Sequence, residues 1–256
     1  MFNSLSPQSL QDRVILVTGA LEGLGRAVTL ACAAEGASVI LSSFQEKDLE
    51  PVYDQIIERG YPEPAILPLD LEQAGEAEYI AAADRIGEAF GRLDGLAQCA
   101  AFAPYLSRID DYDVSEWERV LKINLTAPFT LIQACLPLLR LSEDAAIVLT
   151  SDRVGHKGLA YWGAYAAAKF GTEGLMQVLA DELRGSSRIR VNSLDPGILR
   201  TALRANLYPG EDPSHHPLPE TVAWAYVQLL GPEGRGFMGQ ALRIEQDRLV
   251  PWTACS

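Results

Sequence analysis

The sequence lacks the features that mark secreted, membrane-spanning and metal-binding proteins. Its N-terminus has no basic segment followed by an apolar stretch, so we expect no signal peptide. No run of about eighteen apolar residues is present that would cross a bilayer. His156, His215 and His216 have no partner at metal-ligand spacing, so we expect them in loops and expect no metal site. The cysteines have neither disulfide nor metal-ligand spacing, which favours a reducing, cytoplasmic setting; they are Cys32, Cys99, Cys135 and Cys255.

Positive charge is also scarce. The chain has 21 Lys and Arg residues against 34 Asp and Glu residues, for a formal net charge of −13. Nucleic acids and anionic membrane surfaces require a basic face, so neither is an expected partner. A hydrophobic content of 48% is ordinary for a globular protein with a sizeable core. We therefore expect a small-molecule partner.

Short apolar runs alternate with amphipathic helical periods along the whole chain. The nearly continuous apolar character of these runs is typical of strands buried on both faces of a parallel sheet. Strands are expected over 13–19, 37–43, 64–70, 93–100, 145–151, 188–195 and 240–245. Helices are expected over 23–35, 47–60, 72–91, 115–141 and 161–186. The pattern predicts one α/β domain over 1–256, a Rossmann-type doubly wound parallel sheet of about seven strands flanked by helices.

A glycine-rich turn, "TGALEGLG" from Thr18 to Gly25, connects the first expected strand to the first expected helix. Gly19, Gly23 and Gly25 allow the backbone to turn tightly and to approach a pyrophosphate at the positive end of the helix. Such a turn also occurs as a plain link between a strand and a helix. Its position in an alternating chain favours dinucleotide binding.

The end of the second expected strand usually distinguishes NAD from NADP, because an acid there binds the ribose hydroxyls and an Arg holds a 2′-phosphate. Ser42, Ser43 and Phe44 provide neither. Glu22 in the glycine loop would repel a 2′-phosphate, so we expect NAD or NADP as cofactor with a preference for NAD. Asp70, at the end of the third strand, is expected to contact the adenine or, equally, to cap the next helix.

The segment "YAAAK" places Tyr165 and Lys169 one helical turn apart, so both project from one face. An ammonium group beside a phenol lowers the pKa of the phenol and promotes proton exchange near neutral pH. The pair therefore indicates a proton-transfer unit.

Together with "DL" at 70–71, Asn124 in "KINL" and "DPGILRT" at 195–201, these motifs resemble the short-chain dehydrogenase/reductase family in order and spacing over nearly the full length. The stretch 163–182 resembles the bacterial YciK-type oxidoreductases in particular. The resemblance implies hydride transfer between a nicotinamide cofactor and an alcohol or carbonyl substrate, in a homodimer or homotetramer. The alternative is an impaired, cofactor-binding relative that acts as a sensor or partner subunit.

The resemblance also implies roles for individual residues. Tyr165 would be the general acid/base, and Lys169 would lower the pKa of Tyr165 and hold the nicotinamide ribose. Asn124 would order a water that joins Lys169 to solvent, and the irregular stretch 204–219 would belong to a substrate lid near 199–219. The expected cofactor contacts are Thr18, Gly19, Glu22, Gly23, Leu24, Gly25, Ser43, Asp70, Leu71, Ala100, Tyr165, Lys169, Pro196, Gly197 and Thr201.

The chain departs from the family pattern at two places. "AQCAA" at 97–101 stands where the family has Asn-Asn-Ala-Gly, so Gln98 and Cys99 replace strand-tying asparagines and the methyl of Ala101 faces the cofactor. Asp152 occupies the position of the serine that donates a hydrogen bond to the substrate oxygen. An ionised carboxylate cannot donate, and losing one such donor costs roughly a hundred- to a thousandfold in rate.

Three interpretations of Asp152 remain open from the residues. In the interpretation that we rank first, Asp152 pairs with Arg153, with Lys157 or with a cationic substrate such as an amino alcohol. Alternatively, burial raises the pKa of Asp152 so that it is protonated and donates. In the third, Ser151 or Thr150 supplies the hydroxyl, although strand alternation points Ser151 to the other face.

Overall fold

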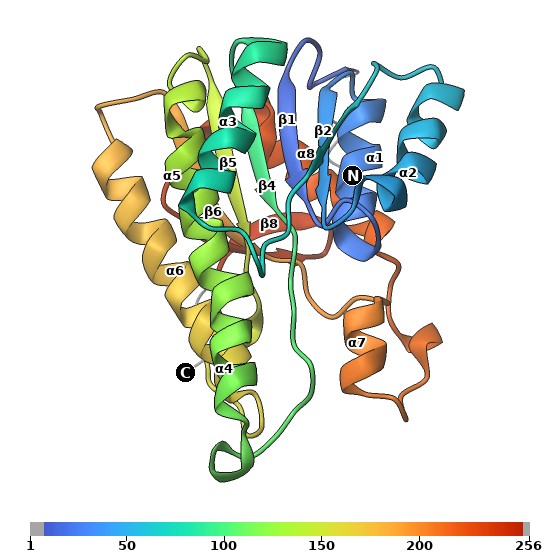
Figure 1. Cartoon of the computed structure of the whole chain (residues 1–256), viewed down its shortest axis with the longest axis vertical. Coiled ribbons are helices and arrows are strands. Elements are labelled where there is room, and N and C mark those ends of the chain that lie inside the picture. The colour runs from blue at the N-terminus through green and yellow to red at the C-terminus, as the bar shows by residue number, and fades with distance from the viewer. Residues whose placement is uncertain (1–7, 253–256) are drawn as a thin grey trace.

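A single eight-stranded sheet forms the centre of the molecule, in a computed structural model that describes residues 8–252 (Figure 1). The strand order is β3-β2-β1-β4-β5-β6-β7-β8; neighbours from β3 to β7 are parallel, and β8 is antiparallel to β7. The strands are β1 (Val14–Thr18), β2 (Ser38–Ser43), β3 (Ala65–Pro68), β4 (Gly95–Gln98), β5 (Ala145–Thr150), β6 (Ile189–Asp195), β7 (Ala241–Glu245) and β8 (Arg248–Pro251). The predicted doubly wound α/β fold is confirmed.

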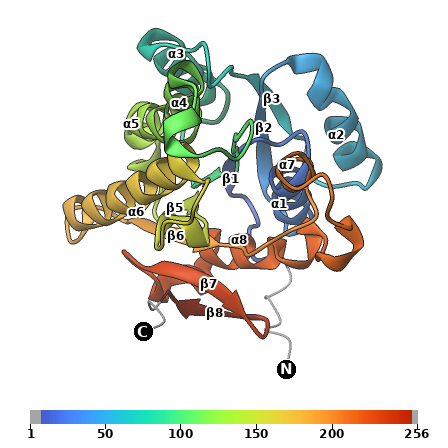
Figure 2. The same ribbon diagram turned by 90° about the horizontal axis from the view of Figure 1, so that it is seen from below.

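Helices cover both faces of the sheet (Figure 2). On one side lie α1 (Gly23–Ala34), α2 (Glu46–Glu58) and α8 (Ala223–Leu230). On the other side lie α3 (Glu76–Phe90), α4 (Val114–Leu121), α5 (Ala127–Leu139) and α6 (Gly163–Leu183). Because both faces are covered, all residues of β1 and β5 are buried, which explains their uninterrupted apolar sequence.

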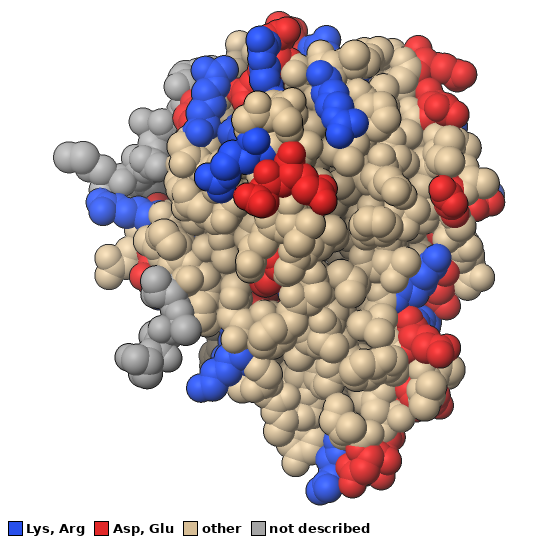
Figure 3. Space-filling view, turned by 90° about the vertical axis from the view of Figure 1, so that its left-hand side faces the viewer, with Lys and Arg blue, Asp and Glu red and all other residues tan. Residues whose placement is uncertain are grey.

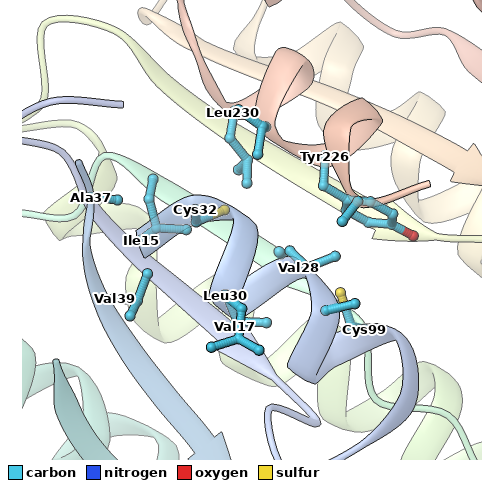
Figure 4. Close-up of a cluster of buried hydrophobic side chains, with 14 of the residues drawn as sticks. Ile15, Val17, Val28, Leu30, Cys32, Ala37, Val39, Cys99, Tyr226 and Leu230 are labelled. Atoms are coloured by element: carbon cyan, nitrogen blue, oxygen red, sulfur yellow. The ribbon is translucent and has the colours of Figure 1, made fainter. Parts of the chain in front are cut away.

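Each face of the sheet has its own hydrophobic core. On the α1 side, Val17, Val28 and Cys32 lie in a cluster into which Tyr226 and Leu230 of α8 project (Figure 4). On the α6 side, a second cluster joins β5 to α3, α5 and α6. Cys32, Cys99 and Cys135 are free and buried in these surroundings; Cys255 lies outside the described residues.

The sheet has one strand more than the sequence predicts. The short strand β8 follows β7 through a turn at Gln246 and Asp247, whose φ angles of 47° and 57° are both positive. Such a pair of positive angles is the signature of a tight hairpin with the twist that flanking strands require. Residues 248–251 were not expected to be a strand because they form a partly exposed edge without a long apolar run.

Two other expectations need correction. The helix predicted over 115–141 is interrupted by a π-helical segment, η2 (Lys122–Thr126), between α4 and α5. The stretch 204–219, expected to be irregular, begins inside the short helix α7 (Ala202–Leu207).

The run Val114–Leu139 is the one segment within residues 8–252 that is long and apolar enough to cross a membrane, with a mean hydropathy of 1.2 in its most apolar window. No such run was expected. In the fold, 44% of that window is buried, and α5 packs against α3 and β4. These contacts are those of a core helix.

Candidate active site

Two adjoining cavities open at the carboxyl ends of the parallel strands. Their volumes are about 320 and 360 Å³, and both are lined by Gly19, Ser43 and Ala100. They lie beside β1, where the chain order turns from β2 on one side to β4 on the other. Ligands of doubly wound sheets bind at this topological switch point. The cavity that Tyr165 and Asp152 line is named the catalytic cavity below, and the one that Asp70 lines is named the adenine-side cavity.

The glycine loop is built by close backbone approach. A Cβ at Gly25 would overlap the carbonyl oxygen of Gly19, so only glycine fits at the first turn of α1. Gly19 has a φ of +68°, and a Cβ there would lie 3.0 Å from the Cα of Ala100. The loop therefore presses against the end of β4 and leaves the N-terminus of α1 facing the catalytic cavity, which Gly23 and Leu24 line.

The tie between β1 and β4 does not need the family's asparagines. The Thr18 hydroxyl accepts hydrogen bonds from the backbone N–H groups of Cys99 (3.1 Å) and Ala100 (3.2 Å). The Gln98 amide donates to the carbonyl of Pro128 at 3.2 Å, which joins β4 to α5. The substitutions in "AQCAA" thus leave this edge of the site connected.

Tyr165 and Lys169 lie together on α6, which follows β5. Tyr165 lines the catalytic cavity and is 6% exposed. Lys169 lies behind the cavity wall at 2% exposure, where its Nζ donates to the carbonyl of Thr150 (2.6 Å) and sits 5.4 Å from the ring centroid of Tyr165. Gly155 packs directly onto Lys169, because a Cβ there would lie 3.0 Å from the Cβ and carbonyl oxygen of that residue.

The expected lowering of the Tyr165 pKa is wrong for this state of the protein. Burial raises the pKa of Tyr165 well above its ordinary value, and the charges of Asp152 and Asp195 raise it further. Burial also lowers the pKa of Lys169, which the nearby carboxylates oppose. Proximity alone suggested the opposite direction, because a sequence does not show how completely the phenol is removed from water.

Asp152 lines the catalytic cavity and begins the 3₁₀ turn η3 (Arg153–Gly155). Its Oδ1 accepts a hydrogen bond from the backbone N–H of Val154 at 2.9 Å. Burial raises the pKa of Asp152, partly offset by that hydrogen bond, and Asp195 raises it further. Among residues 8–252, no Lys, Arg or His lies within 4.0 Å of its carboxylate, so the expected ion pair with Arg153 or Lys157 is absent from this part of the chain.

Both neighbouring hydroxyl residues, Thr150 and Ser151, belong to the lining of the catalytic cavity, but both side chains are largely buried. Thr150 Oγ1 is 2.8 Å from the Tyr226 hydroxyl, on the opposite side of the sheet from α6. Ser151 is 3% exposed, and its Oγ is shielded from solvent. The interpretation in which Ser151 or Thr150 replaces the missing serine therefore receives no support from the structure.

Asn124 lies in η2, where its side chain makes hydrogen bonds to the backbone. Its side-chain amide donates to the carbonyls of Phe102 (2.7 Å) and Val120 (2.8 Å), and its Oδ1 accepts from the N–H of Phe102 (3.0 Å). These bonds compensate for a residue that is a poor helix former. The side chain is fully engaged, and the main-chain carbonyl of Asn124 accepts a long hydrogen bond from the Thr172 hydroxyl at 3.5 Å.

The adenine-side cavity is lined by Thr18, Ser43, Phe44, Asp70 and Leu71. The Asp70 carboxylate accepts from the N–H groups of Glu72 (2.9 Å) and Gln73 (3.2 Å). The proposed cap of the next helix is therefore a cap of the preceding turn, because α3 begins only at Glu76.

The opposite wall of the catalytic cavity is formed by the segment after β6. Gly197, at a φ of +78°, donates its N–H to Asp195 Oδ1 at 2.8 Å. Thr201 caps α7 by accepting from the N–H of Arg204 at 3.2 Å. The Arg204 guanidinium makes paired contacts with Glu211 (2.6 and 2.9 Å), which fixes the segment across the cavity.

The structure brings most predicted site residues to these two cavities. The catalytic cavity is lined by Gly19, Glu22, Gly23, Leu24, Gly25, Ser43, Ala100, Asp152, Tyr165, Pro196, Gly197 and Thr201. Lys169 and Asn124 are buried behind it. Sequence reasoning missed Asp195, Arg204 and Trp162 as wall residues. Asp195 was visible as the first residue of "DPGILRT" and Arg204 as the first residue of the expected lid stretch 204–219, whereas nothing in the local sequence marked Trp162.

The cradle fits a nicotinamide dinucleotide. Two connected cavities lie on either side of a glycine loop in which a Cβ at Gly25 is sterically excluded. The first turn of α1 contains no acidic side chain that would repel a pyrophosphate.

Comparison with known proteins gives a consistent result. The family model described as short chain dehydrogenase matches residues 13–212. The oxidoreductase YciK of Escherichia coli (strain K12), itself uncharacterised, is 40% identical over 93% of this chain and 94% of its own. A short chain dehydrogenase structure from Pseudomonas syringae has a TM-score of 0.92 at 46% identity, covering 95% of this chain and 98% of that one. One from Shigella flexneri 2a, complexed with NADP, has a TM-score of 0.90 at 40% identity, covering 93% and 99%. The chain belongs to the short-chain dehydrogenase family and is an oxidoreductase that uses a nicotinamide cofactor.

Proposed function

We propose that this oxidoreductase interconverts a carbonyl and an alcohol, with Tyr165 as the acid that protonates the carbonyl oxygen. The observation that carries the proposal is the placement of Tyr165 on the cavity wall with Lys169 behind it, held by the Thr150 carbonyl. The glycine loop, Pro196, Gly197 and Thr201 would hold the cofactor, which would supply the hydride. The phenol in its protonated form is the proton donor that carbonyl reduction requires, and the Lys169 ammonium behind it would stabilise the phenolate that forms.

Asp152 replaces the family's serine as a neutral donor in this proposal. One carboxyl oxygen caps η3 through Val154, and the other is available to carry a proton toward the substrate oxygen. Burial and the charge of Asp195 favour that protonated form by raising the pKa of Asp152. The expected cationic substrate ranks second, because a neutral carboxyl has no charge with which to bind it.

The substrate class follows from the remaining wall. Trp162, Leu199, Leu203 and Leu207 form an apolar surface opposite the glycine loop, and the cavity volume of about 320 Å³ suits a small molecule. We propose a compact, mainly apolar ketone or alcohol, enclosed by residues 199–219 as a substrate lid. The whole chain would act as one catalytic domain.

We infer NAD rather than NADP from this chain's own residues. Glu22 lines the cavity beside Ser43, where it would repel a 2′-phosphate. Arg119, the cation on the adenine-side wall, is engaged by Glu72 at 2.9 Å. The Shigella relative with bound NADP favours the opposite preference. Competitive titration of NAD against NADP measures which cofactor this chain prefers.

A homodimer is proposed from the face formed by α5 and α6. Phe129, Phe170 and Val178 are 46%, 47% and 57% exposed there, and Figure 3 shows a broad part of this side without charged side chains. An uncharged face with exposed Phe and Val side chains is typical of an interaction surface. Phe170→Glu should convert the dimer to a monomer in light scattering. The free buried cysteines support a cytoplasmic setting.

The alternative, a cofactor sensor without turnover, is favoured by one observation: Asp152 and Asp195 both make a Tyr165 phenolate costly. Titration of NADH and NADPH by tryptophan fluorescence, followed by a panel of ketones read at the nicotinamide absorbance, separates the two functions. Turnover that falls by about three orders of magnitude or more in Tyr165→Phe supports the enzyme. Cofactor binding without turnover on any carbonyl supports the sensor.

A further inference from the structure

A buried carboxylate lies directly behind the proton-transfer pair. Glu173 follows Lys169 by one turn of α6, so it shares a helix face with Lys169 and Tyr165. It is 4% exposed, and its Oε2 accepts a hydrogen bond from the Ser193 hydroxyl at 2.7 Å. The proposed proton transfer to substrate does not use this carboxylate. Burial of an acid is unfavourable unless its charge is compensated, so its position calls for an explanation.

The second carboxyl oxygen of Glu173 meets a histidine from the turn that carries Asp152. His156 Nε2 lies 3.4 Å from Glu173 Oε1, and His156 follows η3 directly. The close packing of Gly155 on Lys169 brings this turn against α6. A displacement of His156 would therefore also change the positions of Asp152 and Lys169.

The contacts continue to the end of the described chain. The His156 ring stacks on Trp252 with centroids 4.2 Å apart and an interplanar angle of 26°. The Trp252 indole N–H donates to Asp195 Oδ2 at 3.3 Å, and its backbone N–H bonds to the carbonyl of Ala241 at 2.7 Å. Asp195 lines the catalytic cavity. The contacts from Glu173 through His156 and Trp252 to Asp195 therefore start beside Lys169 and end at the cavity wall.

The charge of Glu173 acts on Lys169. Burial lowers the pKa of Lys169, and the groups that raise it are Asp152 at η3, Glu173 on the same helix, Cys99 after β4 and Asp195 of β6. Tyr165 lies on the same helix face and is neutral, as is the buried Asn124. Glu173 differs from Asp152 and Asp195 in lying outside the lining of the catalytic cavity.

We propose that Glu173, His156 and Trp252 form a positioning arc that keeps Lys169 in its charged form and fixes the turn bearing Asp152. The inference rests on the proposed function, because Lys169 must be cationic to support Tyr165. Glu173 provides the charge, His156 holds the carboxylate against α6, and Trp252 connects this contact to Asp195. None of the three touches the substrate.

The test is the pH profile of kcat/KM for ketone reduction in Glu173→Gln. Glutamine keeps the volume and can still accept from Ser193, but it removes the negative charge. The pKa of Lys169 then falls, so activity that requires its charge is lost at lower pH. We expect the alkaline limb to move down by about one pH unit. Glu173→Asp should restore much of the shift, and Glu182→Gln, an exposed acid on the same helix, should leave the profile unchanged.

Substitutions of Trp252 test the end of the arc that contacts Asp195. Trp252→Phe keeps an aromatic ring against His156 but removes the hydrogen bond to Asp195, whereas Trp252→Ala removes both. We expect kcat to fall by about tenfold in the alanine variant and by less in the phenylalanine variant, with an unchanged cofactor Kd.

The outcomes separate this inference from the function on which it rests. If the Glu173→Gln protein folds and binds cofactor but its alkaline limb does not shift, the proposed arc is overturned. The proposed function would still stand in that case, provided that Tyr165→Phe is inactive. Full activity in Tyr165→Phe would overturn the proposed function itself. Thermal unfolding of each variant confirms that the protein measured is folded.

Discussion

The two ends of the catalytic cavity are built by different means. At the glycine loop, backbone meets backbone, and Gly25 leaves no room for even a methyl group. At the lid, the main fixed contacts are charged side chains: Arg204 lies 2.6 Å from Glu211, and His216 lies 3.0 Å from the same carboxylate. The glycine loop is thus fixed by close backbone packing, whereas the segment after β6 is fixed by contacts between charged side chains. A substitution at the first end must therefore move backbone, whereas one at the second end needs to move only side chains.

The largest expected effect is at the backbone end. Gly25→Ala places a Cβ against the Gly19 carbonyl, so the loop must move. We expect roughly 1–3 kcal/mol of lost stability and at least a hundredfold weaker cofactor binding, read by urea unfolding and fluorescence titration. Gly236→Ala is the matched control: Gly236 is exposed at the end of the 3₁₀ turn Pro232–Gly236 with open space around it, and the substitution should change the stability by no more than about 0.5 kcal/mol. Normal cofactor affinity in Gly25→Ala would show that the loop is adaptable.

The next effect concerns Asp152, which faces the substrate between the two ends. Because burial raises its pKa, the proton donor is present below that raised value and is lost as the pH rises through it. Asp152→Asn keeps a cap for Val154 and supplies an amide donor at every pH. We expect this variant to retain reductase activity within about tenfold and to lose the pH dependence caused by the acid, whereas Asp152→Ala should lose roughly a hundredfold or more. An inactive asparagine variant would favour an anionic role, such as binding a cationic substrate.

A smaller effect is expected at the charged end. Arg204 and His216 hold the pKa of Glu211 at about 2, below its ordinary value of 4.5. The stabilisation is therefore complete above the ordinary value and is lost as the pH falls from 4.5 toward 2. Glu211→Gln should mimic that loss at neutral pH by raising the substrate KM a fewfold with no change in cofactor Kd. A rise in cofactor Kd instead would mean that the lid and the cofactor site are not separate.

The smallest effect returns to the cofactor end, at Asp70. Asp70→Ala removes the acceptor for the N–H groups of Glu72 and Gln73 and should cost about 1 kcal/mol in urea unfolding. Asp70→Asn keeps an acceptor and should cost little. If both variants also weaken cofactor binding by a similar factor, the carboxylate contacts the adenine in addition to capping the turn.

Much of the architecture was predictable because parallel strands buried on both faces leave a strong local signal. Val14–Thr18 and Ala145–Thr150 are apolar without interruption, and each is followed by a helical period. The strand at Arg248–Pro251 left no such signal, since an antiparallel edge needs only part of its surface buried. The π-helical interruption at Lys122–Thr126 depends on a tertiary bond between Asn124 and Phe102, which no local pattern encodes.

The candidate site was predictable where a motif states both position and spacing, as for Tyr165, Lys169 and the glycines. The direction of the Tyr165 pKa was not, because it depends on burial and on Asp195, which is distant in sequence. The meaning of Asp152 likewise depends on what surrounds it: its neighbour Arg153 was the expected partner, yet its carboxylate bonds to the Val154 N–H instead. Sequence order identifies reactive groups but does not determine their environment.

The hairpin of β7 and β8 also bears on the order in which the sheet forms. Its strands are joined by the Gln246–Asp247 turn alone, whereas the parallel neighbours are connected through helical crossovers. Hairpins of this type close in about 1–10 μs, far faster than pairings that must first close a long loop. We therefore expect pulse-labelling hydrogen exchange to show early protection at Arg243 and Val250, which face each other across the hairpin, well before the β1–β4 pairing that completes the cofactor cradle.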